Sequence, residues 1–350
     1  MLERARQALA GEEAWVVGGA VRDELLGRPM VDLDIACRQP EAAARRYGAP
    51  VFPLSDRHGA WRVALPDGRT VDFTPLRNGI ESDLATRDFT INAIALPLDG
   101  GEPVDPFDGR ADLERRVLRG VAPSIFDDDP LRLLRAVRLE DELGFRLDPE
   151  TERLMRERAE LVTRPAGERI LAELARLSVP GFERLDELGL LAPLGGSLGR
   201  LRELAAPGPE MRLVAVFEER LARLPVSNDL RRYASTLLRA EAPAGVSARS
   251  VFRFRRATEP WADEAARFLG AAEELVSAIE DARQNDPAEP LLRGDELGLS
   301  PGPEIGRMLA LVEEERAAGT IATREEALEL VRRATIEDGP AQPPSDVTDS

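Results

Sequence analysis

The spacing of apolar residues changes its period about one third of the way along the chain. Up to about residue 122, short apolar runs alternate with Gly, Pro and Asp, which is the pattern of strands joined by turns; the runs are Ala14–Val17, Val31–Cys37, Trp61–Leu65 and Thr70–Thr74. From about Ser124, Leu, Ile and Val recur every three or four residues with Arg and Glu between them, which is the spacing of amphipathic helices. The sequence therefore predicts an α+β protein with a sheet-containing head and an all-helical remainder.

Turn signals divide the helical remainder. Pro-Gly steps occur at Pro180-Gly181, Pro207–Pro209 and Pro301–Pro303. We expect a head over residues 1–122 and helical segments over residues 123–180, 181–256 and 257–336. Residues 337–350 contain three Pro and few apolar residues, so we expect a disordered tail there.

The residue types that build zinc sites and disulfides are scarce. The 350 residues include one His and one Cys, Cys37, which excludes a Cys/His zinc site and an internal disulfide. The segment Met1–Ala10 carries charges and does not resemble a signal peptide. No apolar run approaches the roughly 20 residues that a membrane span needs. We therefore expect a cytoplasmic protein that is not inserted in a membrane.

The charge is unevenly distributed. All 47 basic residues are Arg, and with 64 acidic residues the net charge is −17, which argues against a simple basic nucleic-acid binder. Residues 212–256, however, hold ten Arg and four acidic residues. At the end of this segment Phe alternates with four candidate RNA-binding residues, Arg249, Arg253, Arg255 and Arg256. Guanidinium groups for phosphates and aromatic rings for stacking suit RNA; a half-buried amphipathic element with an arginine face explains the pattern equally well.

Two carboxylates follow each other at a spacing of two residues. In Val31-Asp32-Leu33-Asp34-Ile35, side chains alternate along a strand, so Asp32 and Asp34 project from one face about 7 Å apart. Two like charges so placed repel each other unless a cation lies between them, and Mg²⁺ prefers carboxylate and phosphate oxygens. The other interpretation is a pair of acids on the solvent face of an amphipathic strand.

Three neighbouring segments favour the interpretation that Asp32 and Asp34 bind a metal ion. Gly18 and Gly19, followed by Arg22, form a turn that lets the backbone and a fixed positive charge approach a phosphate. Asp72 repeats the apolar-acid-apolar pattern on a later strand and can supply a third carboxylate. The third segment concentrates polar residues that a core strand would not need, namely Arg87, Asp88 and Asn92.

Together these segments resemble the class II tRNA nucleotidyltransferases (CCA-adding enzymes) and the related bacterial poly(A) polymerases. The matching text runs in order through most of the chain: Gly18–Asp23, Asp32–Asp34, Arg87–Ala93, Asp105–Gly109, Phe126–Arg138, Glu168–Leu174 and Gly294–Gly306. The resemblance implies a head like that of polymerase β, with a mixed sheet and helices, followed by helical neck, body and tail segments.

The resemblance also implies an activity, the transfer of C and A from CTP and ATP to the 3′ end of tRNA by two-metal phosphoryl transfer. Asp32 and Asp34 would hold two Mg²⁺ ions, and Asp72 matches the third acidic position. Gly18, Gly19 and Arg22 would hold the triphosphate. The segment with Arg87, Asp88 and Asn92 would meet the ribose and phosphates.

A helix expected to begin near Pro130 carries the residues that would select the base. Asp129 and Arg132 lie three apart, so we expect them on one helix face. By resemblance this pair replaces a nucleic-acid template by hydrogen bonding the edge of C or A. Arg135 and Arg138 would continue the basic face towards phosphates. A purely structural role for Asp129, as a cap at the helix start, is compatible with the pattern.

The segment after Arg77 is short compared with the family. Only Asn78–Ser82 separate Arg77 from Asp83, whereas typical members carry a longer flexible loop that helps switch from C to A, and members that add only CC have it shortened. CC addition is therefore one of the products we expect. The rival functions are a poly(A) polymerase of the same family and a catalytically silent RNA-binding relative. The sequence leaves the oligomeric state open.

Overall fold

The computed structural model describes residues 1–55 and 59–337, and it divides into two compact units. The first comprises residues 1–198 together with 222–225, and the second comprises 199–221 and the chain from residue 226 onward. The predicted disordered tail lies, apart from residue 337, outside the described residues. Each unit has its own buried core, so each is described by itself.

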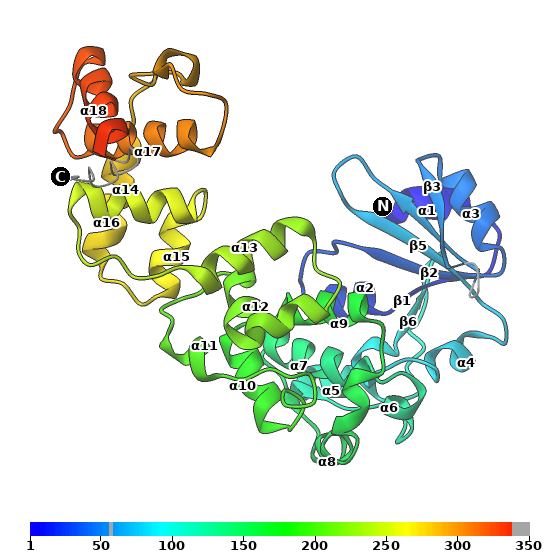
Figure 1. Cartoon of the computed structure of the whole chain (residues 1–350). Helices are drawn as coiled ribbons and strands as arrows, with labels where there is room; N and C mark the ends of the chain where they lie inside the picture. The colour runs from blue at the N-terminus through cyan, green and yellow to red at the C-terminus, as the bar shows by residue number, and fades with distance from the viewer. Residues whose placement is uncertain (56–58, 338–350) are drawn as a thin grey trace, which may run out of the picture. The chain divides into compact units, whose positions relative to one another are not determined.

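A mixed sheet organises the first unit (Figure 1). Over the described residues it has six strands in the order β3-β4-β5-β2-β1-β6, with β2 parallel to β5 and the other neighbours antiparallel. The strands are β1 (Ala14–Val17), β2 (Leu33–Cys37), β3 (Val51–Ser55), β4 (Ala60–Ala64), β5 (Thr70–Pro75) and β6 (Ala95–Pro97). The four predicted strands are confirmed with ends shifted by up to two residues; β3 and β6 were not predicted.

The two faces of this sheet have different partners. Ile35 of β2 and Phe73 of β5 are fully buried, and Tyr47 of helix α3 (Pro40–Tyr47) packs its ring edge-on against Phe73. Because side chains alternate along a strand, Asp34 and Asp72 project from the opposite face. On that face Ala36 joins an apolar cluster, whose other buried members are Val17, Leu76, Ile80, Leu84, Ala93 and Ala95. Asp34 and Asp72 therefore lie beside an apolar cluster, on the sheet face away from α3.

Helices complete the first unit. Those around the sheet are α1 (Leu2–Ala8), α2 (Gly19–Leu25), α3, α4 (Ile80–Leu84) and α5 (Gly109–Arg115), with a 3₁₀ turn, η1 (Thr90–Asn92). Those that follow are α6 (Ile125–Asp128), α7 (Arg132–Leu143), α8 (Pro149–Glu157), η2 (Ala159–Thr163), α9 (Gly167–Leu174) and α10 (Val179–Glu187). Between them a short parallel pair forms, β7 (Val117–Leu118) with β8 (Arg146–Leu147). In the described part of this unit, α7 packs against both α9 and α10.

The regular elements of the second unit, over its described residues, are all helices. Its elements are α11 (Gly199–Glu203), α12 (Pro209–Phe217), η3 (Glu218–Arg223, shared with the first unit), α13 (Asn228–Arg239), α14 (Ala248–Thr258), α15 (Ala262–Phe268), α16 (Glu273–Gln284), η4 (Gly294–Leu297), α17 (Pro303–Ala317) and α18 (Arg324–Glu337). Helix α14 packs against α13, α15, α16 and α17. The predicted change from mixed to helical structure near Ser124 is confirmed, with α6 beginning at Ile125, except that the two-residue strand β8 lies within the part expected to be all helical.

Candidate active site

The Gly-Gly turn after β1 lies directly against the predicted metal-binding strand. Gly18 precedes α2 with φ 72°, a conformation that favours glycine. A Cβ at Gly18 would lie 2.8 Å from Nη1 of Arg87 and 3.1 Å from Oδ2 of Asp34. Only a glycine therefore fits here without displacing one of these groups. The turn, Asp34 and Arg87, which the sequence predicted separately, are brought together.

Asp34 and Asp72 lie side by side in the sheet. They are register partners in the parallel pairing of β2 with β5, and Arg62 of β4 is the antiparallel partner of Asp72. Arg62 donates from Nε to Oδ1 of Asp72 at 2.7 Å and from Nη2 to Oδ2 at 2.6 Å. This two-pronged geometry is the strong form of an arginine–carboxylate pair. Sequence reasoning missed Arg62, although its place on the strand next to Asp72 was a usable signal.

Asp32 comes one residue before β2 begins. Its Oδ1 accepts hydrogen bonds from the Thr70 hydroxyl at 2.8 Å and from the Thr70 backbone N–H at 3.2 Å. Asp32 is exposed, whereas Asp34 is partly covered. The two carboxylates predicted as a pair are thus held at one end of β2, in different surroundings.

The surroundings of Asp34 disfavour its ionised form. Burial raises the pKa of Asp34 to about 6. The charge of Arg87 opposes this shift, while the nearby carboxyls of Asp72 and Asp32 add to it. A carboxylate whose negative charge is incompletely compensated in the protein is a fitting ligand for a cation.

The residues present suit a hard divalent ion held by few protein ligands. Among residues 1–55 and 59–337, no group of three or more His, Cys, Asp or Glu is gathered closely enough to hold a metal ion. Mg²⁺ commonly takes one or two carboxylates and completes its shell with water and substrate phosphates. Asp32 and Asp34 match that requirement.

A chain of polar contacts runs from the Gly-Gly turn into the helical part of the unit. Arg22 donates from Nη1 to Oδ1 of Asn92 at 2.8 Å, and Asn92 donates to Oδ1 of Asp88 at 3.0 Å. Asp88 accepts from Arg135 of α7, at 2.9 Å from Nε and 2.7 Å from Nη2. Four predicted nucleotide-binding residues are therefore brought together, and they bind one another.

The pKa of Asp88 reflects these contacts. Burial alone would raise it, but the charge of Arg135 and the hydrogen bonds from Asn92 and the Phe89 N–H hold the pKa of this carboxyl below its ordinary value. Asp88 is therefore a fully engaged anion that ties η1 to α7.

Asp129 and Arg132 do not share a helix face, and that expectation is wrong. Helix α6 ends at Asp128, Asp129 is extended with φ −144°, and α7 begins only at Arg132. Pro130 is the reason, because a proline disfavours helical geometry in the residue before it. Oδ1 of Asp129 accepts from the Leu131 N–H at 3.1 Å, which agrees with the structural role for Asp129 near the helix start.

The Asp129 carboxylate and the Arg132 guanidinium both have hydrogen-bond partners in the protein. Arg169 of α9 donates to Oδ2 of Asp129 at 2.8 Å. Arg132 donates from Nη2 to the Thr86 carbonyl at 2.6 Å. Arg169 belongs to a segment that carried the family resemblance, but it had no assigned role.

We expected Arg138 on an open basic face, but its side chain is buried. It is 7% exposed and pairs with Glu173 of α9 at 2.5 Å and Glu142 at 2.7 Å. A buried carboxylate opposite a buried guanidinium is a structural ion pair. Helical periodicity places Arg138 on the face that α9 covers, which local spacing could not reveal.

The four predicted RNA-binding arginines lie on α14 of the second unit. Three of them pair with acids of the same unit: Arg249 with Glu315, Arg253 with Glu314, and Arg255 with Glu259 and Asp286. Arg256 is exposed, and over the described residues it has no ion pair. Val251, Phe254 and Thr258 form the buried face of the helix. The alternative of a half-buried amphipathic element with an arginine face therefore describes α14.

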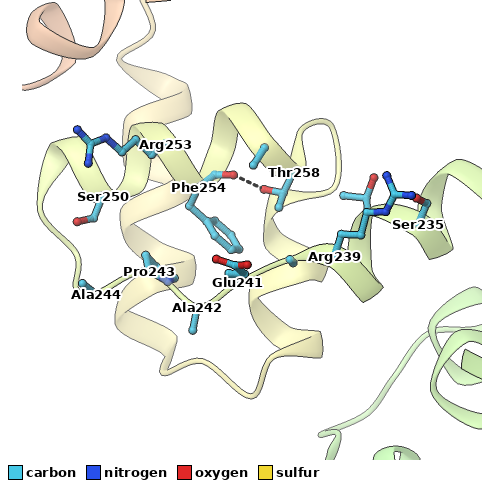
Figure 2. A pocket seen from close by; sticks show the side chains of 13 residues that line it. Ser235, Arg239, Glu241, Ala242, Pro243, Ala244, Ser250, Arg253, Phe254 and Thr258 are labelled. Carbon is cyan, nitrogen blue, oxygen red and sulfur yellow. Dashed lines mark hydrogen bonds between the residues drawn. The ribbon is translucent and has the colours of Figure 1, made fainter. Parts of the chain in front are cut away.

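A cavity of about 500 Å³ opens beside α14 (Figure 2). Its walls come from the end of α13, the connection over residues 240–247 and one side of α14, and the Phe254 side chain points into it. The charged side chains that line it are Arg239, Glu241 and Arg253. Of the predicted site residues, only Arg253 lines this cavity.

Comparison with known proteins decides the family. A CC-adding tRNA nucleotidyltransferase of Geobacter sulfurreducens is 32% identical, covering 91% of each chain. The chain belongs to the family of CCA-adding tRNA nucleotidyltransferases. An A-adding tRNA nucleotidyltransferase of Deinococcus radiodurans is 31% identical over 91% of this chain and 95% of its own length. Members that add different nucleotides are therefore equally similar to it.

Family profiles and solved structures agree with this membership. The profile "Poly A polymerase head domain" matches residues 14–53 and 61–119, and "Probable RNA and SrmB- binding site of polymerase A" matches residues 144–195. The Bacillus stearothermophilus CCA-adding enzyme in complex with CTP superposes with a TM-score of 0.76 at 27% identity, covering 96% of both chains. The Thermotoga maritima CCA-adding enzyme with tRNA has the same fold, with a TM-score of 0.71 at 23% identity. The expected α+β architecture is confirmed.

The described helices also bear on membrane insertion. Within residues 1–55 and 59–337, none is long and apolar enough to span a bilayer.

Proposed function

We propose that this chain is a cytoplasmic, template-independent tRNA nucleotidyltransferase that transfers C or A residues from CTP or ATP to the tRNA 3′ end. We further propose that the short connection after Arg77 restricts it to C. Support comes from the family and from the carboxylates beside the Gly-Gly turn. Residues 1–122 would act as catalytic head, 123–180 as the neck that selects the base, and 181–256 and 257–336 as the body and tail that bind tRNA.

The head residues would hold the reactants in line. Asp32 and Asp34 would hold Mg²⁺, which when bound supplies Lewis-acid activation of the 3′-hydroxyl and neutralises phosphate charge. Gly18 lets the backbone lie directly against Asp34 and the Arg87 guanidinium, and Arg87 would donate to phosphates bound beside Asp34. Arg22 is fixed by Asn92 at the other side of this turn.

The neck residues would select the base. The Asp129 carboxylate can accept a hydrogen bond from the exocyclic amino group that C and A share, and the Arg132 guanidinium can donate to a ring nitrogen. Both groups have partners in the ligand-free protein, Arg169 for Asp129 and the Thr86 carbonyl for Arg132. Base binding would therefore exchange or share these hydrogen bonds, and Arg135 would position Asp88.

The restriction to C rests on one observation, the anchoring of the segment after Arg77. Its residues lead directly into α4, where Ile80 and Leu84 are buried in the apolar cluster of the head. Leu76, just before Arg77, is buried in the same cluster. A segment fixed at both ends over so few residues has little room to rearrange between C and A addition.

The test is extension of tRNA that lacks its tail, with CTP and ATP together, followed by sequencing of the 3′ ends. The expected product ends in CC. A terminal A added to tRNA ending in CC would contradict the restriction. Asp32→Ala should give no extension; retained extension would contradict the assigned metal ligands.

The match of the head to the poly(A) polymerase family favours a second candidate function, poly(A) polymerase. A parallel reaction with ATP and an RNA unrelated to tRNA distinguishes it. Long A tracts on any 3′ end would support that candidate. Addition confined to tRNA supports the proposal above, and binding of tRNA without extension by the unaltered chain would support the silent RNA-binding relative.

A further inference from the structure

The third carboxylate of the head, that of Asp72, is paired with the Arg62 guanidinium. Asp72 is 8% exposed, and each of its two oxygens accepts one hydrogen bond from Arg62, at 2.7 Å and 2.6 Å. The register places Arg62, Asp72 and Asp34 in a row across β4, β5 and β2. The carboxylate nearest to Asp34 in the sheet is therefore already bound to a cation of the protein.

We propose that Asp72 serves as the counter-ion of Arg62 and not as a resident metal ligand, so that the divalent ion is held by Asp32, Asp34 and the phosphates of the bound nucleotide. This inference rests on the proposed function, which supplies the metal and the nucleotide. It goes beyond that function by assigning Arg62 a role and by limiting the protein's metal ligands to two.

Electrostatics support this assignment. If Asp72 turned to a divalent ion beside Asp34, the Arg62 guanidinium would lose both hydrogen bonds and stand next to that ion. A partly buried charge without its partner, close to a like charge, is costly. The paired arrangement avoids this cost because Arg62 compensates one carboxylate and leaves the other two for the metal.

The arrangement has a consequence for the order of binding. A site with two protein carboxylates holds Mg²⁺ weakly in the absence of substrate, because substrate phosphates supply further ligands. The metal would then bind together with the nucleotide. Removal of Arg62 would release Asp72 and create a three-carboxylate site that binds the metal alone.

The test is Mn²⁺ binding to the full chain without nucleotide or tRNA, followed by electron paramagnetic resonance that counts water ligands on the ion. We expect Arg62→Met to raise Mn²⁺ affinity on the order of tenfold and to remove one bound water, because Asp72 becomes a ligand. The double variant Arg62→Met/Asp72→Asn should return to the original affinity and water count, and it keeps the local charge balanced for folding.

Two further variants make the result decisive. Arg87→Met removes a cation near Asp34 without releasing Asp72, so we expect a smaller gain in affinity and no change in water count. If Asp72→Asn in the unaltered background added one water to the bound ion, Asp72 would be a resident ligand and the inference would be overturned. An unchanged water count in Arg62→Met would also overturn it. Nucleotide addition plays no part in this titration, so failure of the proposed function appears separately, in the tRNA products.

Discussion

The roles of three aspartates differ because their surroundings differ. Asp34 is covered and lies beside other carboxyls, so its ionised form is disfavoured. Asp72 is bound on both oxygens by Arg62, and Asp88 is bound by Arg135 and Asn92. The same type of side chain thus provides the proposed metal ligand, the proposed counter-ion of Arg62 and a structural link within one head.

The ionised form of Asp34 should destabilise the metal-free protein at neutral pH. Its pKa is raised from 3.8 to about 6, so its stabilising contribution is complete below its unfolded-state pKa and is lost as pH rises through about 6. Asp34→Asn does not ionise, so at pH 8 it should raise the free energy of unfolding by about 2 kcal/mol. Urea unfolding with EDTA at pH 8 and at pH 4 measures the difference.

The gain should shrink to within about 0.5 kcal/mol at pH 4, where Asp34 is protonated in the folded protein and about half protonated in the unfolded chain. Asp99→Asn is the control, because Asp99 is exposed, and we expect a change within about 0.5 kcal/mol. Equal stability of Asp34→Asn and the unaltered protein at pH 8 would contradict the prediction.

At the scale of elements, ion pairs join α7 to α9. The sequence instead predicted that the arginines of α7 form an open basic face. Arg138 of α7 pairs with Glu173 of α9, and Arg135 lies 3.9 Å from the same carboxylate. Arg169, also on α9, binds Asp129 just before α7. These contacts hold Asp129 and helix α7 against α9, so α9 takes part in building the proposed base-selecting site.

Arg138→Met should destabilise the protein without acting on the nucleotide directly. It leaves Glu173 without its main partner in a covered position, which costs about 3 kcal/mol, whereas Glu142 keeps its ion pair with Arg176. Urea unfolding measures this loss. Arg153→Met is the control, because Arg153 is exposed on α8 and its ion pairs with Glu150 and Glu157 are screened by solvent, so its loss should change stability far less.

A different result would restore the phosphate-binding role. If Arg138→Met raised the KM for CTP while the free energy of unfolding stayed unchanged, Arg138 would act on the nucleotide and not between helices.

At the scale of the whole molecule, the net charge of −17 conceals how the arginines are used. The local excess of Arg over residues 212–256 suggested a basic surface for RNA. On α14, however, Arg249, Arg253 and Arg255 are neutralised by acids of the C-terminal hundred residues. Arg256 is the member of the predicted set whose charge remains available, as far as the described residues show.

Arg256→Ala should weaken tRNA binding more than Arg253→Ala does. Loss of one charge that faces phosphate should lower affinity roughly two- to fivefold and reduce the slope of log affinity against log salt by about 1. Arg253 already pairs with Glu314, so its removal should leave that slope nearly unchanged. Fluorescence titration of tRNA at several salt concentrations measures both values; equal slopes for the two variants would contradict the prediction.

Local patterns in the sequence were sufficient for four strands of the sheet, for the change to helical structure and for the family. Short apolar runs bounded by Gly, Pro or Asp predicted β1, β2, β4 and β5, because such turn residues mark where a buried strand ends. The spacing of Asp32 and Asp34 predicted one end of β2 as a candidate metal site. Two strands escaped prediction: β6 has only three residues, and Pro53 interrupts the apolar run of β3.

Only the tertiary structure decided which charged groups are free and which are paired. Arg62 and Asp72 are 10 residues apart, Arg138 and Glu173 are 35 apart, and Arg169 and Asp129 are 40 apart. Periodicity assigns a side chain to a face of its own element, but the element that covers this face depends on the packing of the whole unit. The sequence by itself therefore determined the fold class, the family and the candidate ligands, while long-range packing determined which arginines and carboxylates are left for a substrate.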